Sequence, residues 1–288
     1  MLIKTSDREA IKKVLGRIVL PEPESHKGHN GKLLIIGGST LFHAASLWAA
    51  EVASHFVDMV HYSSTVENEK IFHELKKVFR NGIIVPQASI DDYAVQDDAV
   101  LIGPGMMREG PDGAYAKKLT ERLIGKFPEK RFVFDAGALQ MMEKEWLFRL
   151  KQKPIITPHQ KEFETLFGIP VMDKNEEDKS KIVKDAARKF NAVILFKAIR
   201  DYVTDGKTSY VISGGNAGLT KGGTGDVLAG LTAALVTKTD PLISAAASSI
   251  LLKKSAEELY RLSGYWYNVT DIINKLPEVL ARELPVKI

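Results

Sequence analysis

The chain has 288 residues, of which 44% are hydrophobic and 26% charged, and its formal net charge is +4. These values are typical of a globular protein large enough to bury a substantial core. The basic residues are scattered, which argues against nucleic acid as a partner, and no apolar run reaches the about 18 residues of a membrane span. Cysteine is absent, which excludes disulfides and thiolate chemistry. Because the N-terminus does not resemble a signal peptide, we expect a cytoplasmic protein.

Predicted strands and helices alternate through most of the chain. At the start, Ser6–Glu9 has the pattern of a capping box and predicts a short amphipathic helix. The predicted strands, several of them apolar without alternation, are Lys32–Gly37, Met59–Ser63, Gly82–Pro86, Ala99–Gly103, Arg131–Asp135, Pro154–Thr157 and Ala192–Lys197. The predicted helices between them are Ala44–Phe56, Glu69–Phe79, Pro111–Phe127, Leu139–Leu150 and Glu176–Phe190. This alternation predicts an α/β fold with a mostly parallel sheet between two layers of helices.

The last third of the chain departs from this alternation. Two β-rich runs flank Asp205-Gly206 within Asp201–Ser213, a strong signal for a late β-hairpin added at the edge of the sheet. The remainder is nearly all helical, with helices that end at Val236, run from about Pro241 to Leu262 and begin at Thr270. No linker, composition shift or internal repeat divides the chain, so we expect a single domain over residues 1–288.

The segment Lys221–Asp226 (KGGTGD) leads straight into the predicted helix that ends at Val236. A glycine-rich turn lets backbone N–H groups approach a ligand, and a helix start adds unpaired N–H groups, so the segment predicts an anion site. A carboxylate there would repel phosphate and needs another role. Removing the proton from a hydroxyl that is about to receive a phosphoryl group is such a role for Asp226.

Five further features follow predicted strands, where ligands of open parallel sheets bind. They are Gly38-Ser39, Pro104-Gly105, Asp135, His159 and Lys197. Each also has a plain structural interpretation: a turn, a helix cap, a pair between His159 and Glu162 or Glu164, or a solvated lysine. Asp226 alone would likewise be an ordinary helix N-cap. Since all of them and Asp226 fall where one cleft would lie, a shared pocket is favoured over six separate explanations.

Several common site patterns are missing from the sequence. The seven histidines are dispersed without the spacing of metal ligands, so no metal-ligating residue is predicted. There is no GxSxG nucleophile elbow and no Walker A loop. The first predicted strand is not followed by GxGxxG, which weakens the case for a dinucleotide dehydrogenase.

Four motifs in this order carry a family resemblance: His26-Lys27-Gly28 with Gly31–Ser39, Gly103–Gly105, Thr157–Phe163 (TPHQKEF) and Gly222–Gly230 (GGTGDVLAG). Together they resemble the ADP/ATP-dependent NAD(P)H-hydrate dehydratases, ribokinase-like enzymes that dehydrate the damaged, hydrated forms of NADH and NADPH. The resemblance covers about residues 20–282 and implies a ribokinase-like three-layer αβα sandwich. From the length of this sequence we do not expect the epimerase domain that is often fused ahead of such a domain.

The resemblance also implies roles for particular residues. Asp226 would be the catalytic base on the hydroxyl of the hydrated ring, and Ala45, Gly105 and His159 would bind the hydrate with it. The implied nucleotide-binding residues are Lys197, Ala198, Ile199, Arg200, Asp201, Gly222, Gly223, Thr224 and Gly225. The implied reaction is phosphorylation of the C6 hydroxyl followed by elimination of phosphate, a carbon–oxygen lyase activity. ADP or ATP would be the co-substrate with Mg²⁺, and a homo-oligomer such as a tetramer would be the assembly, with no nucleic acid or membrane partner.

The sequence departs from the family pattern at several glycines and at one carboxylate. Gly137 stands at the second carboxylate of the family's Asp-(Ala/Gly)-Asp segment, and Ala198, Val57 and Met59 stand where glycines are common. Two alternatives therefore accompany the dehydratase. One is a ribokinase-like kinase of small alcohols, of the thiazole or hydroxymethylpyrimidine type, and the other is a relative that binds nucleotide without catalysis.

Overall fold

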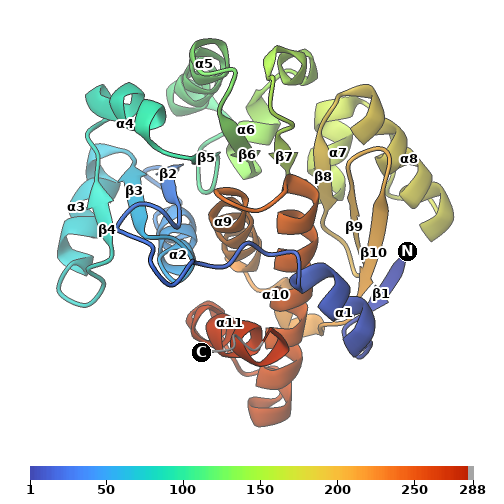
Figure 1. Cartoon of the computed structure of the whole chain (residues 1–288). Coiled ribbons are helices and arrows are strands. Elements are labelled where there is room, and N and C mark those ends of the chain that lie inside the picture. Colours follow the sequence, from blue (N-terminus) through green and yellow to red (C-terminus); the bar gives the residue numbers. More distant parts are fainter. Residues whose placement is uncertain (285–288) are drawn as a thin grey trace.

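The computed structural model describes residues 1–284 and contains one ten-stranded sheet (Figure 1). The strands are β1 Leu2–Lys4, β2 Lys32–Ile36, β3 Met59–Ser63, β4 Gly82–Ile84, β5 Ala99–Ile102, β6 Arg131–Phe134, β7 Ile155–Ile156, β8 Val193–Phe196, β9 Asp201–Thr204 and β10 Ser209–Ser213. Their order is β1-β10-β9-β8-β7-β6-β5-β2-β3-β4. Among these strands only β9 runs antiparallel to its neighbours, so the prediction of a mostly parallel sheet is confirmed.

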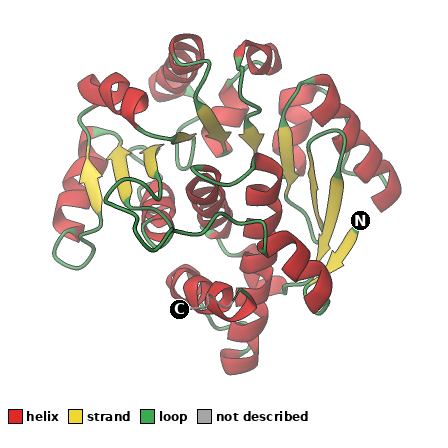
Figure 2. Cartoon of the chain, in the orientation of Figure 1, coloured by secondary structure: helices red, strands yellow, loops and turns green. Residues whose placement is uncertain are grey.

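Helices cover both faces of the sheet, as Figure 2 shows in red above and below the row of yellow strands. The helices are α1 Arg8–Leu15, α2 Ala44–Ala53, α3 Val66–Leu75, α4 Ile90–Gln96, α5 Gly110–Lys126, α6 Ala136–Met141, α7 Gln160–Phe167, α8 Glu176–Lys189, α9 Thr224–Val236, α10 Pro241–Ser263 and α11 Val269–Glu283. None of these helices has both the length and the apolar character that crossing a membrane requires.

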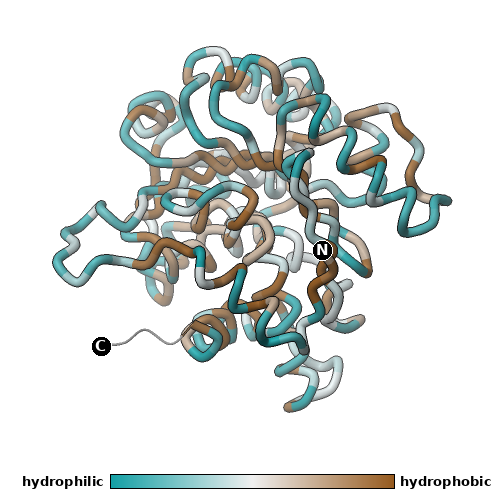
Figure 3. The backbone as a smooth tube through the Cα atoms, turned by 45° about the vertical axis from the view of Figure 1, so that its right-hand side comes forward, coloured by the Kyte–Doolittle hydropathy of each residue, from teal (hydrophilic) through white to brown (hydrophobic). Residues whose placement is uncertain are grey.

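Successive residues of a buried strand point to opposite faces of the sheet and pack into two separate hydrophobic cores. Because both faces are buried, several of the strand sequences are apolar without alternation. In β2, Leu33 and Ile35 join the core under α2, α9 and α10, whereas Leu34 and Ile36 join the core under α5, α7 and α8. All four side chains are buried. Figure 3 shows the same distribution, with hydrophobic segments toward the middle of the molecule and hydrophilic ones in the outer turns. The result is a three-layer αβα arrangement.

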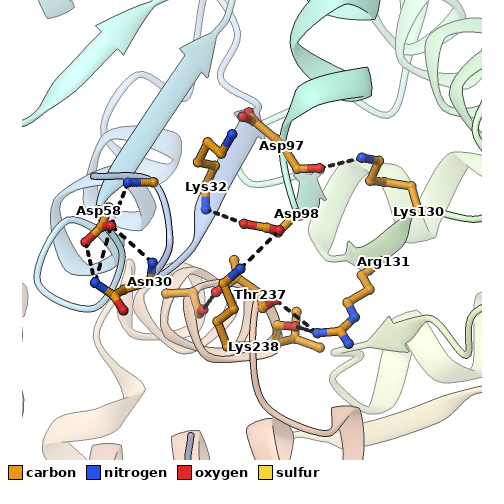
Figure 4. Close-up of polar contacts among 12 residues, drawn as sticks. Asn30, Lys32, Asp58, Asp97, Asp98, Lys130, Arg131, Thr237 and Lys238 are labelled. Atoms are coloured by element: carbon orange, nitrogen blue, oxygen red, sulfur yellow. Dashed lines mark hydrogen bonds and ion pairs between the residues drawn. The ribbon is translucent and has the colours of Figure 1, made fainter. Parts of the chain in front are cut away.

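Helix α9 is fixed to the sheet at its C-terminal end. Figure 4 shows its C-terminal end at the amino edge of the strands, where Arg131 Nη1 donates to the carbonyl oxygens of Val236 (2.7 Å) and Thr237 (3.0 Å). Nearby, Lys238 Nζ lies 3.3 Å from Asp98 Oδ1, and the backbone N–H of Lys32 donates to the other oxygen of that carboxylate. Strand β6 begins at this edge, and α9 packs along the strand in the opposite direction. The helix therefore starts at the other edge of the sheet, where the parallel strands end.

The structure corrects several predicted boundaries. The first helix is capped by Asp7, whose carboxylate accepts from Ala10 N, and not by Ser6, since aspartate caps as well as serine. The last helix begins after Asn268, which forms the capping box with Asp271, and not at Thr270. The predicted helix Leu139–Leu150 is wrong as one element: α6 ends at Met141, and a separate 3-10 helix spans Lys144–Arg149. Each half still contributes buried apolar residues to the core, Leu139 from the first and Trp146 and Leu147 from the second.

The hairpin prediction is confirmed, but its place at the edge of the sheet is wrong. Strands β9 and β10 form an antiparallel pair around Asp205-Gly206. Beyond them β1, which the sequence did not predict, pairs in parallel with β10 and takes the outermost position. The expectation of a single domain over residues 1–288 stays a prediction.

Candidate active site

The segments that follow β2, β5 and β6 meet the first turn of α9 around a cavity of about 370 Å³, called here the Asp226 cavity. Its lining residues are Leu41, Phe42, Ala45, Gly105, Met106, Met107, Arg108, Glu109, Ala136, Gly137, Gln140 and Asp226. The structure thus brings together Ala45, Gly105 and Asp226, which come from three distant parts of the sequence. This is the edge of the sheet at which the strand-end argument expected a ligand.

Glycines at this edge let backbone segments approach each other closely. Gly103 and Gly38 both have positive φ, at 126° and 79°, and a Cβ on Gly103 would overlap the carbonyl oxygen of Asp135. A Cβ on Gly105 would lie 3.2 Å from the Cα of Gly38. The N–H groups of this first glycine turn are used within the protein, since Gly37 donates to Ser63 O and Gly38 to Pro104 O. The turn therefore allows close packing of backbone segments, and these N–H groups are not free to bind an anion.

The start of α9 has a different character. Gly223 is its N-cap residue with φ 100°, and a Cβ there would collide with the Trp48 ring. Asp226 is the third helical residue, so the plain interpretation of Asp226 as the N-cap is wrong. The first-turn N–H groups of Thr224 and Gly225 have no partner inside the helix. The N–H of Thr224 lies 3.3 Å from Lys221 O, so the N–H of Gly225 and the positive helix end remain for a ligand.

Lys197 interacts electrostatically with three carboxylates, those of Asp135, Glu162 and Asp226, beside this helix start. Its Nζ lies 2.8 Å from Asp135 Oδ1 and 3.9 Å from Glu162 Oε2, and it would be 3.5 Å from a Cβ on Gly225. Asp135 and Glu162 are buried, and the Thr157 hydroxyl donates to Asp135 Oδ1 at 2.7 Å. Although burial opposes it, the attraction of Asp135 and Glu162 raises the pKa of Lys197. The plain interpretation of Lys197 as a solvated lysine is therefore wrong.

The same cluster shifts the titration of Asp226. Burial and the negative charge of Asp135 raise its pKa from 3.8 to about 7, and Lys197 opposes this rise. A carboxylate whose pKa lies near neutral pH can accept a proton in one step and release it in the next. The geometry thus supplies a general base next to a lysine and a helix N-terminus, as a phosphoryl transfer would use them.

His159 adopts the plain structural role that the sequence allowed. It caps α7, accepting a hydrogen bond from Glu162 N while Glu162 accepts one from His159 N. Its ring is half exposed and borders a cavity of about 350 Å³, together with Arg108 and Gln140. Arg108 and Gln140 also line the Asp226 cavity, so the His159 side chain lies next to it. The cap orients the ring and leaves its exposed face free for a ligand.

Hydrogen bonds and an ion pair with α10 hold the loop Lys197–Asp201 in place. The Asp201 carboxylate, which is buried, accepts from Ala198 N at 3.1 Å and from the Ser249 hydroxyl at 2.6 Å. Lys253 Nζ lies 3.4 Å from the same carboxylate and donates to Ile199 O at 3.1 Å. The Asp201 side chain therefore faces the helix, while the Ile199 side chain is 94% exposed.

Two of these site-shaping residues were not predicted. Lys253 and Ser249 lie in a helix whose composition indicated only close packing, yet Lys253 is 96% buried, with 4% exposed. A lone lysine inside a stretch of alanine, serine and leucine is the signal that could have found it, since buried lysines are rare unless they are paired. In the part of the chain that the structure describes, no three His, Cys, Asp or Glu side chains gather as a metal site would require.

Comparisons with known proteins point to one family. The model of the NAD(P)H-hydrate dehydratase family matches residues 33–278. A bifunctional NAD(P)H-hydrate repair enzyme of Methanocaldococcus jannaschii is 33% identical over 90% of this chain and 50% of its own. An ADP-dependent (S)-NAD(P)H-hydrate dehydratase of Nitrosopumilus maritimus is 29% identical over 89% of this chain and 91% of its own. The chain spans about half the length of the bifunctional relatives it matches.

Solved structures agree on the fold. A ribokinase-like superfamily protein of Enterococcus faecalis superposes with a TM-score of 0.83 at 21% identity, covering 98% of this chain and 96% of the other. An ADP/ATP-dependent NAD(P)H-hydrate dehydratase of Bacillus subtilis, co-crystallized with ATP and Mg²⁺, gives 0.78 at 22% identity, covering 95% and 97%. The predicted ribokinase-like fold class is confirmed.

Proposed function

The chain belongs to the NAD(P)H-hydrate dehydratase family, and from this membership and the site geometry we propose that it dehydrates hydrated NADH or NADPH with ADP or ATP as co-substrate. The observation that carries the proposal is Asp226. Its carboxylate has a pKa raised to about 7, and it lines a cavity at the start of α9 with Lys197 close to the same helix turn. A phosphate-binding helix start with a base of that pKa suits transfer of a phosphoryl group to a hydroxyl.

The proposed reaction has two steps. Asp226 takes the proton of the C6 hydroxyl while the hydroxyl oxygen forms a bond to the terminal phosphorus of the nucleotide, whose P–O bond breaks. In the second step the C6–O bond breaks, phosphate leaves, and loss of a proton from C5 restores the C5–C6 double bond. Lys197 and the N–H of Gly225 face the region where the transferred group would lie, so they would stabilise its charge in both steps.

We place the nucleotide along Lys197–Asp201 and Gly222–Gly225, because these segments flank the same helix start. The loop Lys197–Asp201 is held by Lys253 and presents its backbone and Ile199 outward. Mg²⁺ is a further part of the proposal. Lys197 already pairs with Asp135 and Glu162, and residues 1–284 contain no cluster of side chains that could hold a metal ion, so the ion would arrive on the nucleotide phosphates, as Mg²⁺ commonly does. It would supply charge neutralisation there.

The test is recovery of the NADH absorbance band from hydrated NADH supplied with ADP or ATP and Mg²⁺. We expect recovery by the wild type, and a loss of about 10²–10⁴-fold in Asp226→Asn, the usual contribution of a general base. Nucleotide affinity should not change in this variant. Asp92→Asn, an exposed carboxylate on α4, is the control and should behave as wild type.

The outcomes also separate the alternatives. A kinase of small alcohols would consume ATP with hydroxyethylthiazole or hydroxymethylpyrimidine and leave the hydrate untouched. A relative without catalysis would bind nucleotide and recover no NADH. Either result contradicts the dehydratase proposal. The homo-oligomer remains a prediction as well, and light scattering of the purified chain would measure its size.

A further inference from the structure

A second cavity, of about 280 Å³, lies across the first glycine turn from Asp226 and is called here the Ser63 cavity. It is formed by the ends of β2 and β3 and by the start of α5. Its lining residues are Ile36, Gly37, Gly38, Ser39, Ser63, Ser64, Thr65, Gln87, Ile90, Met106, Met107, Asp112, Tyr115 and Ala116. Only Gly38 and Ser39 among them belong to a segment that the sequence analysis considered for a ligand.

One buried polar atom without a partner lines this cavity. Within residues 1–284, four buried side-chain polar atoms have no hydrogen-bond partner, and one of them is Ser63 Oγ. Ser63 lines the cavity directly. A buried polar group left unpaired costs about 1–3 kcal/mol, so Ser63 Oγ is a group that a ligand in the cavity would satisfy.

The charges at the cavity select against anions. Its lining contains no lysine or arginine among the described residues and one carboxylate, Asp112. Burial raises the pKa of the hydroxyl of the lining residue Tyr115, and the charge of Glu69 adds a smaller rise. Arg122 also acts on Tyr115, but it is paired with Asp91. A neutral ligand with hydroxyl and amino groups fits this surface, whereas a phosphate would face repulsion.

The two cavities are adjacent and share one backbone segment in their walls. Met106 and Met107 line both the Ser63 cavity and the Asp226 cavity. The Ser63 cavity is slightly below the about 300–1,000 Å³ typical of small-molecule pockets, so it suits part of a ligand. A molecule whose reacting ring lies at Asp226 can therefore extend past the two methionines into it.

We propose that the Ser63 cavity binds the adenosine half of the hydrated dinucleotide and disfavours a 2′-phosphate on its ribose. The inference rests on the proposed function and deepens it by naming the substrate class: the hydrate of NADH is preferred to that of NADPH. Ser63 would bond a hydroxyl or amino group of the nucleoside, and Asp112 would repel the 2′-phosphate. An acidic side chain that accepts from a ribose 2′-hydroxyl discriminates in the same way in other dinucleotide sites.

Ser63→Ala tests the binding contact. Because Ser63 Oγ has no partner among residues 1–284, its removal should leave the Tm unchanged or raised. The KM for hydrated NADH should rise about five- to tenfold, the worth of one hydrogen bond, with kcat nearly constant. Hydrated nicotinamide mononucleotide, which lacks the adenosine half, should show the same KM with both proteins. Equal effects on the two substrates, or none, would overturn the assignment.

Asp112→Lys tests the charge selection. Asp112 is exposed and is the third residue of α5, and the matched control Asp92→Lys changes the exposed third residue of α4. We expect Asp112→Lys to shift the ratio of KM values toward hydrated NADPH by about two- to fivefold, as an exposed charge pair would, while Asp92→Lys leaves it unchanged. A wild type that prefers the NADPH hydrate, or an equal shift in both variants, contradicts the proposal.

A binding experiment separates failure of this inference from failure of the proposed function. Fluorescence titration of NADH, with the nucleotide site saturated by ADP, reads the Ser63 cavity without turnover. We expect weaker NADH binding in Ser63→Ala and unchanged binding of the reduced mononucleotide. If no hydrate is turned over but this difference persists, the dehydratase proposal fails and the subsite stands. If turnover is normal but NADH binding does not change, the subsite fails alone.

Discussion

Asp226→Asn should stabilise the folded protein at the same time as it abolishes turnover. The folded state raises the pKa of Asp226 from 3.8 to about 7, so the native protein holds a proton that the unfolded chain releases between these values. Stability therefore falls as the pH rises from about 4 to about 7 and stays low above it. Below pH 4 both states are protonated and the carboxyl contributes nothing. An asparagine at this position does not titrate, so the variant does not lose stability in this way over this pH range.

The size of the effect follows from the shift. From 3.8 to about 7 is about 3 units, which corresponds to about 4 kcal/mol at about 1.4 kcal/mol a unit. Asp226 lines a cavity and is only partly buried by its surroundings, so solvent screening reduces the effective value to about 2 kcal/mol. For a chain of this size that difference moves the Tm by about 5 °C.

Thermal unfolding of the wild type and Asp226→Asn from pH 4 to pH 8.5 measures this directly. The Tm difference should be near zero at pH 4 and grow to its full value above pH 7, while Asp92→Asn shows no such growth. In parallel, kcat/KM of the wild type should fall below about pH 7, because the base is then protonated. A variant that is less stable than the wild type at pH 8 would refute the raised pKa and, with it, the role of Asp226 as a near-neutral base.

Two further predictions concern the shape of the site. Lys253→Met removes the contacts that hold the loop Lys197–Asp201, so the nucleotide KM should rise about tenfold, and the unpaired Asp201 carboxylate should cost about 3–5 kcal/mol of stability. Adding Asp201→Asn should restore the Tm but not the nucleotide KM. Recovery of both would contradict the role of Lys253 in holding the loop. Gly137→Asp should lower the Tm and the activity together, because its Cβ would overlap the Met106 carbonyl oxygen, whereas Gly125→Asp, with nothing within 4 Å, serves as the control that keeps both.

The strands were predictable because they are buried on both faces. Runs such as Ala99–Gly103 and Ala192–Lys197 are apolar throughout, and the structure contains a strand within each. Strand β1 has three residues and gains its place only by pairing with Val211 and its neighbours, far along the chain. A segment that short carries no periodicity, so the sequence alone did not reveal it. Several helix ends shifted by one to four residues, since several capping residues competed.

The strand-end rule found half of the site. It selected Asp135, Lys197 and His159, and the structure places Asp135 and Lys197 in direct contact. It did not reveal that Glu162 turns back to the same lysine, nor that Lys253 supports the loop, because these contacts depend on how helices pack on the sheet. Ser63 closes a predicted strand, so the same rule extended to it would have reached the second cavity. Its missing partner, however, is visible only in three dimensions.

The departures from the family pattern divide according to the edge of the sheet on which they lie. Val57 packs against Gly31, and Met59 opens β3, so both belong to the amino edge, opposite Asp226. Changes there alter packing and do not reach a substrate. Gly137 and Ala198 lie at the carboxyl edge, but Gly137 has no room for a side chain beside Met106, and the Ala198 N–H is held by Asp201. The local backbone has therefore adapted to both residues, and the base, the lysine and the helix start keep their arrangement.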